Sequence, residues 1–412
     1  MLNKNGEREL AYVVKVNKIT PMNADRLECA HIDGWHCVVG KGEFHEGDLA
    51  VYFEIDSQLP EVFPFNQMEF LKSKKYKIKT QKIRGEYSQG LLVPLMAFVD
   101  NSAREPVWLA ALMISVQNRQ DVVGTFLTKE LGVTYAVAED NARKASSVDK
   151  YKKMAQRKPK LFAKPFVRWM MRRAWGKRVM FFFFGKKKDK KNGWPQWVVK
   201  TDEERVQNMP WLFPDNTEEW IATEKIDGTS TTFTMKGHGR KRQFFVCSRN
   251  VCFDKPDKKC FYETNVYIEM AEKYHIEETL AAMLDAHGKK GDVEFITIQG
   301  ETYGQTIQKR DYGLKEHRFA VFNIIYGFKD GHTERLNPLE CKAICEVIGL
   351  PCVPVVYRSF FLPKTCEELL EVATGKSEID GGMREGLVFR SIDGVKSFKA
   401  VSNEYLMRYH YE

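Results

Sequence analysis

The octapeptide TEKIDGTS, residues 223–230, does not have the composition of a core element. It places one lysine between two acids and continues with a glycine and small hydroxyl side chains. Strand-like residues lie on both sides, Trp220 and Ile221 before it and residues 231–235 after it. Side chains at the ends of strands are held by a rigid sheet and stay open to solvent, so functional groups are common there. The pattern predicts a turn at the mouth of a pocket, and a solvated surface turn is the alternative.

Three residues of this octapeptide suit phosphate chemistry. Lys225 becomes a nucleophile once its amine loses its proton, which nearby cations or a metal favour by lowering the pKa. Gly228 allows a tight turn or a close approach of the backbone to a phosphate. Asp227 offers a carboxylate to a divalent metal. Because K-x-D-G is short and recurs by chance, the inference depends on the rest of the chain.

Five short motifs follow the octapeptide in order. They are SRN at 248–250, GETYG at 300–304, FAVFNI at 319–324, EGLVFR at 385–390 and KSFK at 396–399. The ordered set resembles the motifs of the covalent nucleotidyltransferases, which are the polynucleotide ligases and mRNA capping enzymes. The resemblance spans roughly residues 195 to 400, and an ordered set is far more specific than any one short string.

Length and composition bound the architecture. A chain of 412 residues, 43% of them hydrophobic, fits two or three domains with real cores. Its nine cysteines are an odd number without C-x-x-C pairs, which argues against a disulfide scaffold or a zinc site. Cys341 and Cys345 lie one helical turn apart, which favours small buried thiols on a helix. The first seven residues have no apolar signal core, so we expect a cytoplasmic protein.

The positive charge of the chain is concentrated in one segment. The net charge is +9, yet residues 143–191 hold about 19 lysines and arginines against two acids, roughly +17, which leaves the remainder near −8. Such clustering suggests a polyanionic partner. A helix is predicted after Pro165, and four interpretations of the segment stay open: a solvated linker, an RNA-backbone contact, a membrane-surface helix and a helix packed on a domain. No run is long and apolar enough to span a bilayer.

Residues 8 to about 100 read as short strands separated by turns. The expected strands are 10–19, 27–32, 35–39, 49–55, 76–83 and 91–95. This spacing predicts a small closed barrel, and residues 23–28 resemble the opening hairpin of tRNA-binding OB modules. The module either binds RNA or only supports its neighbour. Basic residues in 74–84 alternate with other residues, which would place many of them on one strand face as phosphate contacts or as edge protection.

The remaining boundaries complete the expected fold. Residues 101–136 read as a helical tail, and the stretch around Trp194 marks the start of the last domain. Thr201 with Glu204 forms a capping-box pattern that predicts a helix start. Residues 200–208 also resemble the segment that leads into the lysine motif of RNA ligases with an N-terminal OB module. We therefore expect an α+β protein with three parts: an OB-like β-barrel module at 1–136, a basic linker at 137–194, and a nucleotidyltransferase domain of antiparallel sheets flanked by helices at 195–412.

The resemblance implies roles for individual residues. Lys225 would attack the α-phosphate of ATP, release pyrophosphate and become lysyl-AMP. Glu224 would accept a hydrogen bond from the adenine amino group, which favours ATP over GTP. Arg249 would hold ribose or phosphate, and an ordinary surface arginine is the alternative. Glu301 would bind the ribose or help to bind metal.

The later motifs supply the rest of the implied site. Phe322 would stack on adenine, with a plain core position as the rival interpretation. The family commonly has aspartate after that aromatic, whereas this chain has Asn323. Lys399 matches the last lysine of the final motif, but Ser397 stands where the family usually has another lysine, and strand alternation would point Lys396 away. The implied catalytic residues are Lys225, Asp227, Glu385 and Lys399; the implied nucleotide contacts are Glu224, Arg249, Glu301, Phe322 and Lys396; the implied ligands for Mg²⁺ or Mn²⁺ are Asp227, Glu301 and Glu385.

The order of the modules favours one branch of the superfamily. DNA ligases and capping enzymes place an OB domain after the last lysine, whereas this chain has its OB-like module in front and few residues after Lys399. The resemblance therefore implies an ATP-dependent RNA ligase that joins a 3′-OH to a 5′-phosphate of nicked or broken RNA, in RNA repair. We expect a monomer without stable membrane association. A DNA ligase, a capping-type guanylyltransferase and a non-catalytic RNA-binding protein with a decayed ligase domain remain as alternatives.

Overall fold

The computed structural model describes residues 8–99, 106–135, 194–195, 197–200, 203–214, 217–253, 262, 264–287 and 291–410. The chain divides into one unit of Met1–Tyr135 with Trp194–Glu412 and a second unit of Ala136–Gly193. The basic segment 143–191, the helix predicted after Pro165, Thr201 and Cys260 lie outside the described residues.

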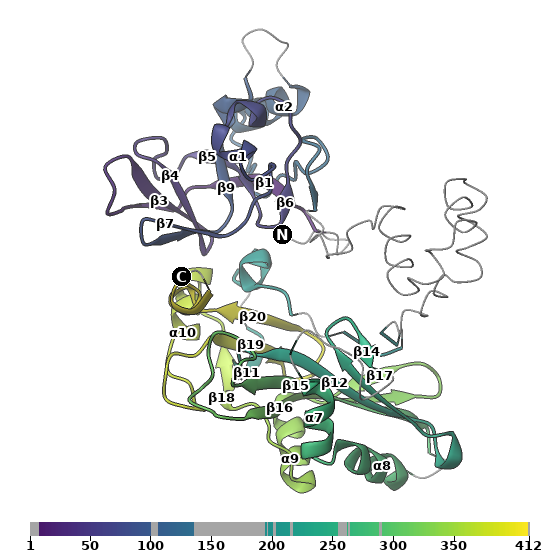
Figure 1. Cartoon of the computed structure of the whole chain (residues 1–412). Coiled ribbons are helices and arrows are strands. Elements are labelled where there is room, and N and C mark those ends of the chain that lie inside the picture. Colours follow the sequence, from purple (N-terminus) through teal and green to yellow (C-terminus); the bar gives the residue numbers. More distant parts are fainter. Residues whose placement is uncertain are drawn as a thin grey trace, which may run out of the picture. The chain divides into compact units, whose positions relative to one another are not determined.

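The N-terminal module is built from short antiparallel strands (Figure 1). Its strands are β1 Ala11–Lys15, β2 Lys18–Pro21, β3 Leu27–Ile32, β4 Trp35–Gly40, β5 Leu49–Phe53, β6 Ser57–Gln58, β7 Gln81–Ile83, β8 Glu86–Ser88, β9 Leu91–Pro94 and β10 Thr134–Tyr135. Its helices are α1 Glu69–Lys72 and α2 Val107–Gln117, with 3₁₀ turns η1 Phe65–Gln67 and η2 Leu95–Phe98. Helix α2 lies within residues 101–136, the segment for which a helical tail was predicted.

The predicted closed barrel is not formed by the strand ladders of the described residues. Within residues 8–135 the ladders are separate: β1-β5-β9, β2-β3-β4, β7-β8 and β6-β10. Two side-chain clusters still fill the module, one around Val13, Val51 and Phe65 and the other around Trp35 and Tyr52. The module is therefore held by packing between small sheets.

The strand predicted at 76–83 is mostly absent. Lys75 and Tyr76 have positive φ angles of 53° and 57°, and only the last three residues join a ladder as β7. The prediction that basic side chains alternate along one strand is therefore wrong, because a left-handed turn breaks the two-residue period of a strand. Lys75, Lys79, Lys82 and Arg84 are nevertheless exposed.

The C-terminal domain contains two antiparallel sheets (Figure 1). The six-stranded sheet has the order β14-β13-β12-β15-β16-β17, and the four-stranded sheet has the order β18-β11-β19-β20. The strands are β11 Glu219–Lys225, β12 Thr229–Lys236, β13 Gln243–Ser248, β14 Cys252–Phe253, β15 Val293–Gly304, β16 His317–Phe328, β17 Thr333–Arg335, β18 Val355–Phe361, β19 Gly386–Ser391 and β20 Ser397–Val401. The octapeptide turn connects the two sheets, because β11 belongs to one and β12 to the other.

Helices cover both sheets and complete the predicted α+β architecture. They are α7 Val266–Lys273, α8 Ile276–Ala286, α9 Pro338–Ile348, α10 Cys366–Ala373, α11 Asn403–Tyr405 and a π-helical turn at Leu406–His410, with η5 Gly239–Lys241 as a short 3₁₀ turn. Helices α7, α8 and α9 contact the six-stranded sheet and α10 contacts β20. Ile276, Leu280 and Leu284 recur every four residues on α8, so they share one face and are fully buried in the core.

The capping box predicted at Thr201 and Glu204 does not start a helix. The first regular turn after it is the three-residue η3 Val206–Asn208, followed by η4 Pro210–Leu212. Glu204 Oε1 instead accepts hydrogen bonds from the Arg205 backbone N–H and from Asn208 Nδ2. Capping boxes occur at α9, where Asn337 pairs with Glu340, and at α10, where Thr365 pairs with Glu368. Among the described residues no helix is long and apolar enough to cross a membrane.

Candidate active site

A cavity of about 330 Å³ opens between the two sheets of the C-terminal domain, around the octapeptide turn. A volume of this order is typical of sites for small molecules. Its walls combine acids, cations, hydroxyls and one aromatic ring. The lining residues are Glu203, Thr223, Glu224, Lys225, Ile226, Gly228, Thr229, Ser230, Arg249, Glu301, Gln308, Phe322, Val353, Val388, Arg390 and Lys399. Most of the residues predicted for the site therefore meet at one cavity.

Lys225 is the last residue of β11, so its position is fixed by the four-stranded sheet. It pairs with Gly386 of β19, which brings Glu385 beside it, and Lys225 Nζ lies 2.7 Å from Glu385 Oε1. The turn that follows is packed tightly against β15. A Cβ on Gly228 would lie 2.3 Å from the carbonyl oxygen of Thr302 and 2.8 Å from Glu301 Cγ. Glycine is therefore required here by the close approach of the neighbouring strand.

Asp227 lies on the inner side of the turn and is 5% exposed. Its backbone N–H donates to the Tyr312 hydroxyl at 2.7 Å, and its Oδ2 accepts from the Tyr405 hydroxyl at 2.9 Å. Tyr405 is fully buried and belongs to α11, near the end of the described chain. Asp227 is thus anchored by two tyrosines and is not among the residues that line the cavity wall.

The charges around Lys225 are strongly coupled. Burial alone lowers the pKa of Lys225, but Glu385, Glu301 and Asp227 outweigh it and the pKa is raised. Burial raises the pKa of Glu301 to about 8; Lys225 opposes this shift, and the negative charges of Glu385 and Asp227 add to it. The amine is therefore protonated, and one cation serves three acidic side chains, of which Glu301 keeps its own proton up to a pH of about 8.

This imbalance fits an additional divalent cation. Three carboxylates near one lysine offer hard oxygen ligands of the kind that Mg²⁺ and Mn²⁺ prefer. The side-chain oxygens of Asp227, Glu301 and Glu385 are not preassembled, since the only described group of three ligand atoms within 4.8 Å of one another is a cysteine cluster. Oxygens of a bound substrate would have to complete the coordination, as is usual for Mg²⁺ at phosphate sites.

Glu224 lines the cavity but its carboxylate is already held by a loop. Its Oε1 accepts from the Ser377 hydroxyl at 2.5 Å and its Oε2 from the Glu378 backbone N–H at 2.8 Å. Burial raises the pKa of Glu224, and these two donors partly oppose the shift. Because a carboxylate has about four acceptor sites, two bonds leave room for a ligand amino group. Ser377 is a site residue that the sequence analysis missed, since nothing in the sequence links it to Glu224.

Phe322 reaches the cavity through a β-bulge. Gln299 pairs with Asn323 and Gly300 with Val321, so Phe322 is the extra residue in β16. Bulges re-aim side chains and are common beside active sites. Phe322 is partly buried and lines the cavity. Asn323 is 1% exposed, donates to Gln299 Oε1 at 3.0 Å and does not line the cavity.

The two lysines of the final motif lie in different environments. Lys399 lines the cavity, and its backbone N–H donates to the Glu204 carbonyl at 2.8 Å. Lys396 is 58% exposed, lies outside the cavity lining and pairs with Glu218 at 2.9 Å. Ser397 donates its hydroxyl to Glu203, a cavity residue. Ser397 and Lys399, two residues apart on β20, therefore share the cavity side, whereas Lys396, the residue before the strand, lies outside the cavity lining.

Arg390 lines the cavity, and the sequence analysis gave it no role. Its side chain is 2% exposed and donates to Glu203 Oε1 at 3.1 Å and to the Phe322 carbonyl at 3.2 Å. It thereby ties the segment before β11 to the bulge. Arg249 follows β13, lines the cavity and is exposed. The only sequence signal for Arg390 was its place in the same motif as Glu385.

Comparison with known proteins adds an independent test. Residues 218–401 match the RNA ligase family, and residues 10–95 match an OB-fold domain. No protein with a curated function matches the sequence.

Solved structures of an RNA ligase from Naegleria gruberi share the fold. A variant solved with ATP and manganese is 26% identical, with a TM-score of 0.62, and the match covers 97% of this chain and 99% of that chain. A variant with AMP and manganese is 26% identical, with a TM-score of 0.61, over 98% of this chain and 99% of that chain. The enzyme with pyrophosphate is 26% identical, with a TM-score of 0.60, over 98% and 99%. The resemblance found in the sequence is confirmed: residues 218–401 form a domain of the RNA ligase family, and an OB-fold domain precedes it in the chain.

Proposed function

We propose that this chain is an ATP-dependent RNA ligase that joins a 3′-OH to a 5′-phosphate through lysyl-AMP and RNA-adenylate intermediates, in RNA repair. The observation that carries the proposal is the position of Lys225 in a cavity that also holds Glu224, Arg249, Phe322 and Lys399. A nucleophilic amine, an aromatic face and two cations are what an adenylyl transfer needs.

In the first step, Lys225 Nζ would attack the α-phosphorus of ATP. The nitrogen–phosphorus bond forms as the bond to the β-phosphate oxygen breaks, and pyrophosphate leaves. Lys399 and Arg249 would hold phosphate oxygens as negative charge builds up, which is the main contribution of a protein to phosphoryl transfer. The cavity would position the nucleotide so that attack and departure are in line.

Two residues of the cavity lining, Phe322 and Glu224, would orient the adenine base. The Phe322 ring would stack on adenine, and Glu224 would accept from the adenine amino group. Guanine presents a carbonyl at that position, so a carboxylate there disfavours GTP. This role of Glu224 would distinguish a ligase from a capping-type guanylyltransferase, whereas stacking on Phe322 would suit either purine.

Lys225 must lose its proton before it can attack phosphorus, and a divalent cation held by the three acids would lower its pKa. Asp227, Glu301 and Glu385 would bind Mg²⁺ or Mn²⁺, which would neutralise their field and stabilise the developing phosphate charge. Loss of that negative field removes the reason for the raised pKa of Lys225. Glu385 would then no longer be the ion-pair partner of the amine.

Two further transfers complete ligation. A 5′-phosphate oxygen of RNA attacks the adenylyl phosphorus, the phosphorus–nitrogen bond breaks and the lysine is regenerated. The 3′-OH then attacks the 5′-phosphorus of the RNA-adenylate, a phosphodiester forms and AMP leaves. Both steps are positioning-dependent displacements.

The test is self-labelling with ATP carrying a labelled α-phosphate. Wild-type protein with Mg²⁺ or Mn²⁺ should carry the label through denaturing electrophoresis, Lys225→Ala should not, and Lys396→Ala is the matched control that keeps the label. Protein is treated with pyrophosphate beforehand, because already adenylylated lysine cannot accept label. Label on Lys225→Ala, or no label on treated wild type, would overturn the proposal.

The acceptor is identified with nicked duplexes. We expect that the protein seals nicks with RNA ends when ATP is present. We expect that it does not seal all-DNA nicks. Labelling by GTP would indicate a capping-type enzyme, and equal sealing of all-DNA nicks a DNA ligase. RNA binding without labelling or sealing would indicate a decayed domain.

The N-terminal module would grip RNA beside the break. Lys75, Lys79, Lys82 and Arg84 are exposed cations in one segment of an OB-fold domain, a class that tracks nucleic-acid backbones. Lys79→Glu with Lys82→Glu should weaken nick sealing and reduce its salt dependence, but leave self-labelling unchanged. Lys129→Glu, an exposed lysine elsewhere in the module, is the control. Equal losses of sealing and self-labelling would exclude this role.

A further inference from the structure

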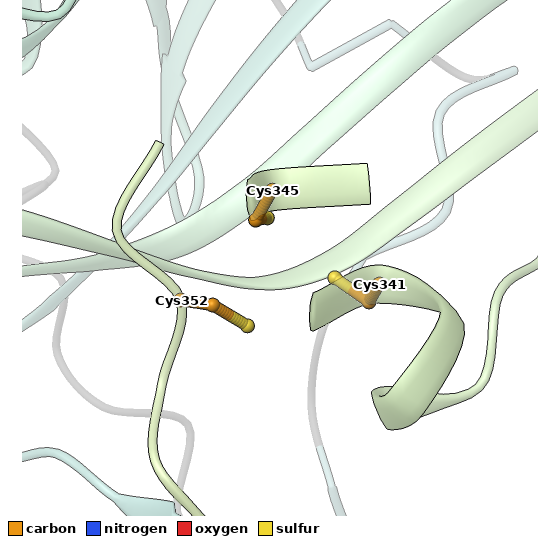
Figure 2. Close-up of side chains that lie close together, drawn as sticks. All are labelled: Cys341, Cys345 and Cys352. Atoms are coloured by element: carbon orange, nitrogen blue, oxygen red, sulfur yellow. The ribbon is translucent and has the colours of Figure 1, made fainter. Parts of the chain in front are cut away.

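Three cysteines that the adenylyl-transfer chemistry does not use meet beside the six-stranded sheet. Cys341 and Cys345 lie on α9, and Cys352 lies on the segment that follows it; their three sulfur atoms are within 4.8 Å of one another. Figure 2 shows the side chains directed into a shared space between the helix and this segment. Among the described residues this is the only such group of three ligand atoms.

The local fold explains the convergence. Cys341 and Cys345 share one face of α9 because they are four residues apart. Gly349 ends the helix in the left-handed conformation, with φ of 71°, and the chain reverses. The returning segment forms a parallel bridge between Cys352 and Val321 of β16, so Cys352 faces the helix. The arrangement is set by backbone hydrogen bonds and does not depend on the thiols.

Burial distinguishes this group from incidental core cysteines. Cys341 and Cys345 are 1% and 0% exposed, whereas Cys352 is partly exposed and leaves one open side.

The spacing suits a soft metal ion. With metal–sulfur bonds of about 2.3 Å, tetrahedral geometry places sulfur atoms about 3.8 Å apart. Sulfur atoms already within 4.8 Å can reach that separation by small changes of side-chain torsion. Thiolates select Zn²⁺ and Cu⁺ over hard cations such as Mg²⁺. The predicted ligands for Mg²⁺ or Mn²⁺ are carboxylates, so the two kinds of ion would not compete.

We propose that Cys341, Cys345 and Cys352 form a binding site for one thiophilic d¹⁰ cation, Zn²⁺ or Cu⁺. Zn²⁺ would take a solvent ligand on the open side at Cys352, whereas Cu⁺ would be satisfied by three sulfurs. The bound ion would replace the thiol protons, which are released on binding.

Such an ion would stiffen one wall of the nucleotide cavity. Val321 N–H donates to the Pro351 carbonyl at 2.8 Å, and Val353 N–H donates to the Val321 carbonyl at 2.9 Å. Val353 and Phe322, the next residues on the two segments, both line the cavity. Loading should therefore raise thermal stability and reduce the mobility of the aromatic wall.

The experiment measures metal content of the reduced full-length chain after dialysis against Zn²⁺ and, in a second arm, against Cu⁺. Wild type should retain one ion. Cys352→Ser should lose that ion, because its affinity for the metal should be at least tenfold weaker than that of wild type. Cys366→Ser is the matched control, since Cys366 is a buried cysteine of a different core cluster. Cobalt substitution should give a thiolate charge-transfer band in wild type and Cys366→Ser only.

A second readout keeps the test independent of folding of the variant. Metal-loaded wild type should protect Cys341, Cys345 and Cys352 from alkylation, read by peptide mass spectrometry. Equal metal content in wild type and Cys352→Ser, or no retained ion in either arm, would overturn the proposal. So would a disulfide between Cys352 and a helix cysteine that forms in mild oxidant while the reduced protein takes up no metal.

Discussion

Lys225 Nζ lies 2.7 Å from Glu385 Oε1, so the amine proposed as nucleophile is held as an ion pair in the protein without substrate. The contact follows from the pairing of Lys225 with Gly386, which brings the end of β11 to the start of β19. An amine in this state cannot attack phosphorus, because its lone pair carries a proton. In the proposed mechanism, the ion pair would keep Lys225 inactive until the negative field is neutralised.

The first prediction concerns the pH dependence of that amine. Glu385→Gln removes a negative charge that raises the pKa of Lys225, so the neutral amine should form at lower pH. The rate at which an amine-directed acylating reagent modifies Lys225, followed by mass spectrometry, should rise at a lower pH than in wild type. Glu378→Gln, an exposed acid of the neighbouring loop, should leave the profile unchanged. An unchanged profile in Glu385→Gln would contradict the ion-pair account.

The raised pKa of Glu301 predicts that the stability of the fold depends on pH. Its pKa is about 8 in the folded protein against an ordinary 4.5, so the folded state binds the extra proton between these values. Stability should therefore fall as pH rises from 4.5 to 8 and level off above that window. Glu301→Gln should remove this loss and raise the free energy of unfolding at pH 8 by on the order of 2–4 kcal/mol. Urea titrations at several pH values measure the free energy of unfolding of wild type and Glu301→Gln, with Glu294→Gln on the same strand as the control. A difference between wild type and Glu301→Gln that does not change with pH would refute the prediction.

The two lysines of the last motif should differ sharply when truncated. Lys399→Ala removes a cation from the cavity wall and should slow self-labelling by roughly 10²–10³-fold. Lys396→Ala removes only an exposed ion pair with Glu218, and its rate should stay within about twofold. Single-turnover labelling rates compare the two proteins directly. Similar losses in both would mean that Lys396 does reach the nucleotide.

Ser377 should affect nucleotide affinity through Glu224. Ser377→Ala deletes the donor to Glu224 Oε1, so the buried carboxylate keeps only the Glu378 N–H of its two loop donors and its pKa should rise further. KM for ATP should increase about 3- to 10-fold, equivalent to roughly 1 kcal/mol, with little change in the maximal labelling rate. Ser359→Ala, at an exposed position of β18, is the comparison. A loss confined to the maximal rate would argue that Glu224 acts on chemistry.

Arg390 should be a stability residue as well as a wall of the cavity. Arg390→Lys cannot reach both Glu203 and the Phe322 carbonyl, because a lysine offers a single point charge. The free energy of unfolding should fall by about 1–3 kcal/mol. Arg358→Lys, on the exposed side of β18, should be neutral in the same chemical denaturation assay. Neutral behaviour of Arg390→Lys would show that one of the two contacts carries no energy.

Much of the site was predictable because its residues lie in short motifs whose order is informative. Lys225, Glu224, Glu301 and Lys399 reach one cavity because each stands at a fixed place on a strand. The fold class followed from the same source, together with the turn-separated strands of the N-terminal module.

The features that could not be predicted depend on departures from simple periodicity. The bulge that turns Phe322 into the cavity breaks the period of two, and left-handed residues at Lys75 and Tyr76 break the strand predicted around them. The cysteine cluster needs the reversal at Gly349, which places Cys352 outside the helical repeat. Ser377 and Arg390 act through partners distant in sequence, and no local pattern encodes such contacts.

The hydrogen bond from Tyr405 to Asp227 has a consequence for how the protein is made. Tyr405 is added to the nascent chain 178 residues after Asp227, which at cellular rates of synthesis is a delay on the order of 10–30 seconds. During that time Lys225 has already left the ribosome, but the turn beside it lacks its hydrogen bond to Tyr405. Until Tyr405 has been synthesised, Asp227 therefore lacks the hydroxyl that donates to its Oδ2.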